Sequence, residues 1–190
     1  MREAYRLLPR CATRAAWTPA SRPAIVRARG HARSAALDAE RARSLLMTER
    51  YGRSLDLRAE TGSTNDDARA AADGGAPSGH VVVADAQTRG RGSHGRSWSS
   101  PAGTDLYLSI VERTQLPPRS IPVLTLAVGL GVARAVEALA PGRDVRVKWP
   151  NDVWLDGKKC AGILVESSST GARIDAFVVG IGLGVNRTEW

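Results

Sequence analysis

The stretch VRVKWPNDVWLDGKKCAGILVES, residues 145–167, decides the fold class, because it places several short strand patterns next to one another. Apolar and β-branched runs lie at 145–149, around 153–155 and at 160–167. Short polar turns separate them, and Asp156-Gly157 is typical of a two-residue hairpin turn. Adjacent strands joined by tight turns predict an α+β domain with a mixed or antiparallel sheet.

Outward from this stretch, the remaining elements follow from apolar periodicity. Further strands are expected at 55–60, 80–87, 105–112 and 172–185. Helices are expected at 37–48, from Ser63 or Thr64 to Gly74, and from Ser120 to about Ala140. The predicted fold is a mixed, largely antiparallel sheet flanked by helices, and it occupies residues 37–190.

The positive charge of the chain is concentrated at its start. The net charge is +8, and residues 1–33, with eight arginines and one acid, carry +7 of it. A nucleic-acid-binding domain is expected to carry such charge on its folded surface, so no nucleic-acid partner is predicted. Residues 1–36 are expected to be a disordered basic extension, with an organelle transit peptide or a stretch translated from a misassigned start codon as alternatives.

Composition and cysteine usage are those of an ordinary globular protein, with 43% hydrophobic and 24% charged residues. No run of 18 or more apolar residues is present, so no membrane-spanning segment is predicted. Two cysteines, Cys11 and Cys160, are too few for a disulfide framework or a paired-cysteine metal site. A reducing, cytoplasmic location is therefore expected.

A loop rich in glycine and arginine, GRGSHGR (90–96), follows the strand predicted at 80–87. It matches the dinucleotide-binding pattern G-x-G-x-x-G, but that pattern requires a helix to begin within it. SWSSPAG (97–103) follows instead and is a poor helix former, so a dinucleotide site is not predicted. Arg91 and Arg96 suit phosphate or carboxylate groups, and the glycines let the backbone approach a ligand. The alternative is a solvated surface loop.

The motif KWPND (148–152) places a lysine, an amide and a carboxylate at the end of a strand. Lys148 and Asn151 suit phosphate oxygens, and Asp152 suits Mg²⁺. The alternative is a simple Asn-Asp turn between two strands.

Two further strand patterns carry residues of chemical interest. Lys158 and Lys159 lie on opposite faces of one strand, so Lys159 is expected to point inward and Lys158 into solvent. GIGLGVN (180–186) alternates glycine within a strand, which leaves one face bare for a flat ligand, with Asn186 at its end. The alternative is a bulge or a tight crossing against a helix.

The hydroxyl-rich stretch ETGSTN (60–65) begins a predicted helix. Its hydroxyls either cap the helix or, with the backbone N–H groups, face the polar head of a ligand.

In this order, the motifs resemble the catalytic domain of the biotin–protein ligases. The matching stretches within residues 38–190 are ETGSTND, ADAQTRGRGSHGRSWSSPAGTDLYLS, VKWPNDVWLDGKKCAGILVES and VVGIGLGVN. The resemblance implies a fold similar to the core of class II aminoacyl-tRNA synthetases. It also implies a ligase that forms biotinyl-5′-AMP from biotin and ATP and transfers biotin to a lysine of a biotin carboxyl carrier protein.

The same resemblance implies roles for individual residues. The implied catalytic residues are Lys159, Arg91 and Asp152. The implied biotin-binding residues are Ser63, Thr64, Asn65, Gln87, Gly90, Arg91, Gly92, Ser93, Lys159 and Gly162. The implied ATP-binding residues are Arg96, Lys148, Asn151, Asp152 and Asn186, and Asp152 is also expected to hold Mg²⁺.

Departures from the family pattern and rival families bear on the activity. Many family members have an arginine where this chain has Ser93, so weaker retention of the adenylate is expected. Family members continue beyond Asn186 and end in a small β-barrel, so the catalytic domain is expected to be incomplete. No helix-turn-helix pattern precedes residue 37, so a repressor function is not expected.

Two alternative functions are considered. One is a lipoate–protein ligase, against which the GRG…GR…W and KWPND strings count. The other is a non-catalytic biotin-binding remnant.

Overall fold

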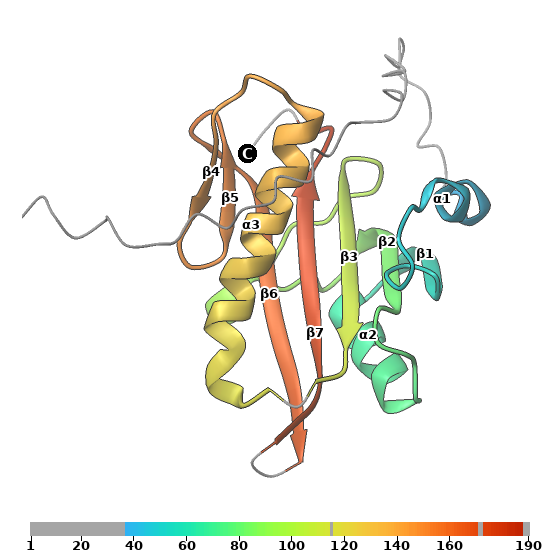
Figure 1. The fold of residues 1–190 in the computed structure, drawn as a ribbon. Helices are drawn as coiled ribbons and strands as arrows, with labels where there is room; N and C mark the ends of the chain where they lie inside the picture. Colours follow the sequence, from blue (N-terminus) through green and yellow to red (C-terminus); the bar gives the residue numbers. More distant parts are fainter. Residues whose placement is uncertain (1–36, 115, 171–172, 188–190) are drawn as a thin grey trace, which may run out of the picture. The chain divides into compact units, whose positions relative to one another are not determined.

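The computed structural model describes residues 37–114, 116–170 and 173–187 (Figure 1). The basic extension expected at 1–36 lies outside the described residues. The helices are α1 (Ala39–Leu45), α2 (Thr64–Asp73) and α3 (Ile121–Leu139), with short 3₁₀ turns η1 (Ser93–Gly95) and η2 (Pro118–Ser120). The strands are β1 (Leu55–Thr61), β2 (Val81–Gln87), β3 (Asp105–Glu112), β4 (Val145–Lys148), β5 (Asp152–Leu155), β6 (Lys158–Thr170) and β7 (Arg173–Gly184).

The seven strands form one sheet in the order β1-β2-β3-β7-β6-β5-β4. β1 and β2 pair in parallel, and every other neighbouring pair is antiparallel. The α+β class and the mixed, largely antiparallel sheet are therefore confirmed. β3 and β6 both pair with β7, so the strand with alternating glycines lies in the middle of the sheet.

α3 covers one face of the sheet over β4, β5 and β6 (Figure 1). Ala133 and Val136 of α3 pack with Ala161, Ile163 and other apolar side chains of the main core cluster. Because side chains alternate along a strand, the neighbours of these β6 residues point to the opposite face. That opposite face is where Gly162 of β6 and Gly182 of β7 present no side chain.

α2 packs on this second face, over β2, β3 and β7. Ala68 and Ala72 of α2 form a smaller buried cluster with Val82, Val111 and Val178. The helix thus leaves its N-terminus beside the glycines of β7, and a Cβ atom added to Gly180 would overlap Asn65 Oδ1. Close approach of α2 to the sheet therefore requires glycine at this position.

The observed elements agree with the sequence-based expectations apart from their ends. α1 is shorter than the helix expected at 37–48, and β6 begins two residues earlier than the strand expected at 160–167. The early start of β6 follows from the hairpin turn. Asp156 and Gly157 both have positive φ, 49° and 78°, as a tight two-residue turn requires, so pairing resumes directly after them.

Among the described residues, α3 is long and apolar enough, by length and composition alone, to cross a membrane. Its inner residues Ala133 and Val136 are buried against the sheet, whereas Val123, Leu126 and Leu130 on its outer surface are exposed. An apolar helix that covers a sheet passes the same test of length and composition. The test therefore gives only weak support for a membrane segment.

Candidate functional site

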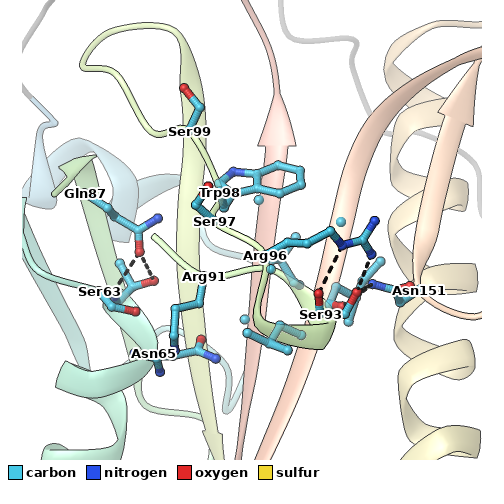
Figure 2. A pocket seen from close by; sticks show the side chains of 18 of the residues that line it. Ser63, Asn65, Gln87, Arg91, Ser93, Arg96, Ser97, Trp98, Ser99 and Asn151 are labelled. Carbon is cyan, nitrogen blue, oxygen red and sulfur yellow. Dashed lines mark hydrogen bonds between the residues drawn. The ribbon is translucent and has the colours of Figure 1, made fainter. Parts of the chain in front are cut away.

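A pocket of about 250 Å³ lies on the α2 face of the sheet, between the start of α2, the 88–104 loop, β6 and β7 (Figure 2). It brings together residues that are more than a hundred positions apart in the chain. Of the residues assigned to the site from the sequence, those that line the pocket are Ser63, Thr64, Asn65, Gln87, Arg91, Gly92, Ser93, Arg96, Asn151, Lys159 and Gly162.

One end of the pocket is polar and is built on the first turn of α2. The side chain of Ser63 at the N-cap makes no capping hydrogen bond. Gln87, at the end of β2, performs that function instead, because its Oε1 accepts from the backbone N–H of Thr64 at 2.9 Å. Its Nε2 in turn donates to Ser100 Oγ at 2.9 Å. The Gln87 amide is therefore held in one orientation against the pocket, beside Ser63 (Figure 2).

The glycine-arginine loop folds back on itself as a small hairpin over the pocket. Arg91 forms an antiparallel bridge with Ser97, and His94 and Gly95 at its tip have positive φ. A Cβ atom at Gly90 would overlap the carbonyl oxygen of Trp98, so only glycine permits this closure. The loop is therefore shaped by its glycines and does not begin a helix.

The loop places the indole of Trp98 directly against the bare strands. Cβ atoms added at Gly162 and Gly182 would lie 2.7 Å and 2.6 Å from the ring. Trp98 Nε1 is buried and contacts no hydrogen-bond acceptor among the described residues. In Figure 2 the indole lies between Gln87 and the side chains of Arg96 and Asn151, and all of these line the one pocket.

The second end of the pocket is cationic. Lys159 Nζ lies 2.7 Å from Asp152 Oδ1 and 5.0 Å from the centre of the Trp98 ring. As expected from strand alternation, Lys159 is half-buried in the pocket while Lys158 is exposed. The Lys159 ammonium is therefore positioned between a carboxylate and an aromatic face.

Ser93 connects the loop to this cationic end. Its hydroxyl oxygen accepts from Arg96 Nη2 at 2.8 Å and from Asn151 Nδ2 at 3.3 Å. Asn151 is buried and also donates to the carbonyl oxygen of Ile163 at 3.1 Å. The serine hydroxyl thus fixes the Arg96 guanidinium beside the Asn151 amide (Figure 2).

Arg91 is bound at the polar end by two carboxylates. It donates to Asp66 at 2.7 Å and to Glu166 at 2.9 Å. The hydrogen bond to Asp66 raises the pKa of the Arg91 guanidinium, and the same bond lowers the pKa of the Asp66 carboxyl. Arg91 and Lys159 line one shared pocket, as the interpretation of the sequence requires.

Four residues assigned to the site from the sequence are not part of the pocket lining. Gly90 shapes the loop, and Asp152 lies behind Lys159. The ammonium of Lys148 lies over the Trp154 ring, 4.4 Å from its centre. Asn186 donates through its backbone N–H to the carbonyl of Thr104 at 2.7 Å. ATP-binding roles for Lys148 and Asn186 stay predictions.

Sequence reasoning did not assign three residues that the structure brings to the site: Trp98, Glu166 and Arg187. Trp98 and Arg187 line the pocket, and Arg187 also pairs with Asp105 and donates to the carbonyl of Ser99 at 2.9 Å. Glu166 accepts from both Asn65 and Arg91. An aromatic residue close to the glycine-arginine loop was a visible signal for Trp98. Glu166 offered none, because its partners lie far away in the chain.

The described residues at the site could supply only part of the coordination shell of a magnesium ion. Among the described residues, no group of three or more histidine, cysteine or acidic side chains is placed to hold a metal. Asp152 supplies one carboxylate at the cationic end. Mg²⁺ often binds one or two protein carboxylates together with substrate phosphates, so this arrangement fits an ion that arrives with a triphosphate.

A model of the biotin/lipoate A/B protein ligase family matches residues 62–186. The chain is 39% identical over 142 residues to the bifunctional ligase/repressor BirA of Bacillus spizizenii, covering 75% of this chain and 43% of that protein. It is 43% identical over 141 residues to a biotin–[acetyl-CoA-carboxylase] ligase of Mycobacterium tuberculosis, covering 72% and 50%. The chain therefore spans half or less of the length of these relatives.

Among solved structures, the chain is similar to the biotin protein ligase of Leishmania major in complex with biotinyl-5-AMP. The TM-score is 0.60 at 33% sequence identity, and the match covers 73% of this chain and 60% of the Leishmania chain. The region matched by the family model contains the start of α2, the glycine-arginine loop and the glycines of β7, which form the pocket.

Proposed function

Because the chain belongs to the biotin/lipoate A/B protein ligase family, we propose that it is a biotin–protein ligase. It forms biotinyl-5′-AMP from biotin and ATP and then transfers biotin to a lysine of a biotin carboxyl carrier protein. The observation that carries the proposal is a single pocket with a polar end at Thr64 and Gln87 and a cationic end at Lys159 and Arg96. Biotin has the matching shape, with a polar ring at one end and a carboxylate at the other.

Biotin is proposed to lie in the pocket beside Trp98, with its ureido ring at the polar end. The side chains of Gln87 and Thr64 line that end, and Ser63 has a hydroxyl that no capping bond uses. The apolar part of the ligand then contacts the Trp98 ring, which covers the backbone at Gly162 and Gly182. A pocket that is mostly apolar with a few positioned polar groups is typical of small-molecule sites.

The first step brings together two anions, and the residues at the cationic end suit that task. A carboxylate oxygen of biotin attacks the α-phosphorus of ATP, and the bond from that phosphorus to the pyrophosphate oxygen breaks. Lys159 is proposed to bridge the carboxylate and the α-phosphate, while Arg96 and Asn151 bind phosphate oxygens. Fixed cations of this kind accelerate such a step through positioning and charge stabilisation.

Asp152 is the residue that would hold a Mg²⁺ ion brought by ATP. When bound, the ion neutralises phosphate charge, as metal ions do in phosphoryl transfer. Asp152 holds Lys159 at 2.7 Å before ligands arrive, so the carboxylate also positions the lysine.

The second step transfers biotin to the carrier. The neutral amine of the carrier lysine attacks the acyl carbon of the adenylate, the bond to the AMP oxygen breaks, and the amine loses a proton. We propose that Asp152 assists the loss of this proton. The adenylate is a mixed anhydride that water destroys, so the hairpin over the pocket is expected to close on it and exclude water.

The proposed location of the protein is the cytoplasm, because the proposed reaction uses ATP and a biotin carboxyl carrier protein.

Isothermal titration of the chain with biotin and with lipoate, each with and without ATP and Mg²⁺, tests this function. The proposal predicts binding of biotin, tighter retention once ATP allows adenylate formation, and no binding of lipoate. Lipoate binding without biotin binding would identify the lipoate-specific activity of the same family. Biotin binding without adenylate formation would identify a binding remnant.

A further inference from the structure

Lys148 lies on the same face of the sheet as the pocket, beside the cationic end. Val145 and Val147 of β4 pack against the main core cluster on the α3 face, so the next side chain along, Lys148, points to the opposite face. Residues that pair across an antiparallel sheet share a face, and Lys148 pairs with Asp152, which pairs with Gly162. This row of residues therefore runs from the strands of the pocket to Lys148 on the edge strand β4.

The Lys148 ammonium is held by an aromatic ring instead of a carboxylate. Its Nζ lies 4.4 Å from the centre of the Trp154 ring, and it forms no ion pair within the described part of the chain. Asp152, its partner across the strands, is bound by Lys159 at 2.7 Å. Trp154 Nε1 is buried and meets no acceptor among the described residues, so the indole offers Lys148 a face and not a hydrogen bond.

An aromatic ring holds a cation without neutralising it. The attraction comes from the negative face of the ring, and the ammonium keeps its full charge and its three N–H donors for an anion. A carboxylate partner would first have to be displaced by the anion. Lys148 is exposed, so an anion can reach it from solvent. The lysine is therefore held in place and is still able to bind a phosphate.

The direction of the proposed reaction leads toward this lysine. The order β2-β3-β7-β6-β5-β4 places the polar end of the pocket at Gln87 on β2 and the cationic end at Lys159 on β6. In phosphoryl transfer the attacking and leaving oxygens lie roughly in line on either side of the phosphorus. Biotin attacks from the β2 side, so the pyrophosphate departs toward β5 and β4. The cations on that face of β4 are Lys148 and Arg146, and Arg146 is already bound to Asp144 at 2.9 Å.

We propose that Trp154 is a positioning residue that holds the Lys148 ammonium where the β- and γ-phosphates of ATP bind and from where pyrophosphate leaves. The inference rests on the proposed function and deepens it, because Lys159 and Arg96 then act on the α-phosphate alone. When the phosphates arrive, the ammonium turns from the ring face to them by rotation of its own flexible side chain. Trp154 acts through Lys148 and touches neither substrate.

Trp154→Leu removes the ring face and keeps an apolar side chain on the strand. We expect the KM for pyrophosphate in biotin-dependent ATP–pyrophosphate exchange to rise about fivefold, the equivalent of one cation–π contact, with the maximal rate unchanged. The Kd for biotin should not change, because Trp154 lies outside the pocket lining. Trp154→Phe retains a ring face and should keep the KM within about twofold of the unaltered chain.

A double-variant cycle with Lys148→Met separates this role from a purely structural one. If Trp154 acts through the lysine, Trp154→Leu has no further effect once Lys148 is replaced, and the KM of the double variant equals that of Lys148→Met within about twofold. Arg146→Met is the matched control, because it removes a cation on the same face of β4 that is bound to Asp144. Its KM should stay close to that of the full 190-residue chain without substitutions.

Three results of the exchange assay would each overturn the inference. They are an unchanged KM in Trp154→Leu, a fivefold rise that persists in the Lys148→Met background, and an equal rise in Arg146→Met. Weaker binding of biotin by Trp154→Leu would also contradict it, because the substitution would then disturb the pocket itself. Thermal melts show whether each variant folds, and if Trp154→Leu does not fold, NMR of the unaltered chain decides.

Failure of the unaltered chain to exchange pyrophosphate with ATP would contradict the proposed function, and the same NMR measurement then decides the role of Trp154. It follows the ε-methylene signal of Lys148 in the unaltered chain, assigned through its loss in Lys148→Met. The ring must displace this signal upfield, and inorganic pyrophosphate must move it while the signal of the exposed Lys158 stays in place. A Lys148 signal that shows no displacement by the ring, or that pyrophosphate does not move, would overturn the inference.

Discussion

Lys159 Nζ and Asp152 Oδ1 lie 2.7 Å apart, on neighbouring strands joined by the tight turn at Asp156 and Gly157. The turn and a shift of register between Val153 and Trp154 together bring the two side chains to one end of the pocket. The contact links the proposed cation for adenylation to the proposed acid for metal binding and transfer. A substitution of either residue therefore tests the proposed roles of both.

Lys159→Met is expected to reduce adenylate formation by about 10²- to 10³-fold, the usual effect of removing one donor to a developing charge. Biotin-dependent release of pyrophosphate measures the rate. Lys158→Met is the matched control, because Lys158 is exposed on the other strand face and lies outside the pocket lining. Equal losses in the two variants would count against the proposed role of Lys159.

Asp152→Asn is expected to slow transfer from supplied biotinyl-AMP to the carrier by about 10²-fold, since it removes the group that assists proton loss. Supplying the adenylate bypasses the first step and any loss of Mg²⁺ there. Asp156→Asn, at the nearby hairpin turn, controls for the change of charge. Full transfer by Asp152→Asn would refute a role for this carboxylate in the second step.

Ser93→Arg is expected to slow release of biotinyl-AMP by about tenfold, because a charge-assisted hydrogen bond to the phosphate is gained. Rapid filtration or stopped-flow release of the purified adenylate measures the rate constant. His94→Arg adds the same charge one residue further, at the exposed tip of the loop, and should release the adenylate as fast as the unaltered chain. An unchanged release rate in the Ser93→Arg variant would contradict the idea that Ser93, in place of an arginine, weakens retention of biotinyl-AMP.

Gly182→Ala is expected to destabilise the protein by about 1–3 kcal/mol, because its Cβ would lie 2.6 Å from the Trp98 indole. The displaced indole should also weaken biotin binding. Gly131→Ala in α3 is the contrasting change, since nothing lies within 4 Å of the added Cβ. It should stabilise the protein by up to about 1 kcal/mol through helix propensity. Urea denaturation of both variants compares the free energies of unfolding, and a neutral Gly182→Ala would contradict the close packing of Trp98.

The Asp66–Arg91 pair makes stability depend on pH in a defined direction. The hydrogen bond from Arg91 lowers the pKa of the Asp66 carboxyl in the folded protein. A lowered folded-state pKa stabilises the protein above the unfolded value, about 3.9, and the gain disappears as pH falls through the folded-state value. Because the Asp66 side chain is 48% exposed, the gain should stay below about 1 kcal/mol.

Denaturant unfolding of the unaltered chain and Asp66→Asn at pH 7 and at successively lower pH measures this gain. The difference in unfolding free energy should be present at pH 7 and shrink below about pH 4. A difference in unfolding free energy that grows as the pH falls would show that the Asp66–Arg91 pair does not stabilise the folded protein in the stated way.

Much of the sheet could be predicted from the sequence because strand signals are local. Alternation placed Lys159 inward and Lys158 outward, and the Asp-Gly dipeptide predicted the turn that precedes β6. The glycines of β7 predicted a bare face, and the structure shows that this face meets both a ring, at Gly182, and the start of a helix, at Gly180. The close crossing against a helix that was offered for that pattern occurs at Gly180, while a bare face for a ligand stays a prediction.

The rest depends on contacts between distant parts of the chain. Glu166 and Asn65 are 101 residues apart and meet only because α2 packs over β7 and β6. The capping of α2 by Gln87 instead of Ser63 likewise follows from the parallel pairing of β1 with β2. Lys148 and Asn186 were assigned to ATP by resemblance, and their contacts with Trp154 and Thr104 were not visible in any local pattern.

Mass spectrometry of the chain incubated with biotin, ATP and Mg²⁺ tests the central claim most directly, because it detects biotinyl-5′-AMP itself. The account predicts the adenylate in the presence of biotin, none with lipoate in its place, and little with Lys159→Met. A folded chain that binds biotin yet yields no adenylate, or one that adenylates lipoate instead, would contradict it.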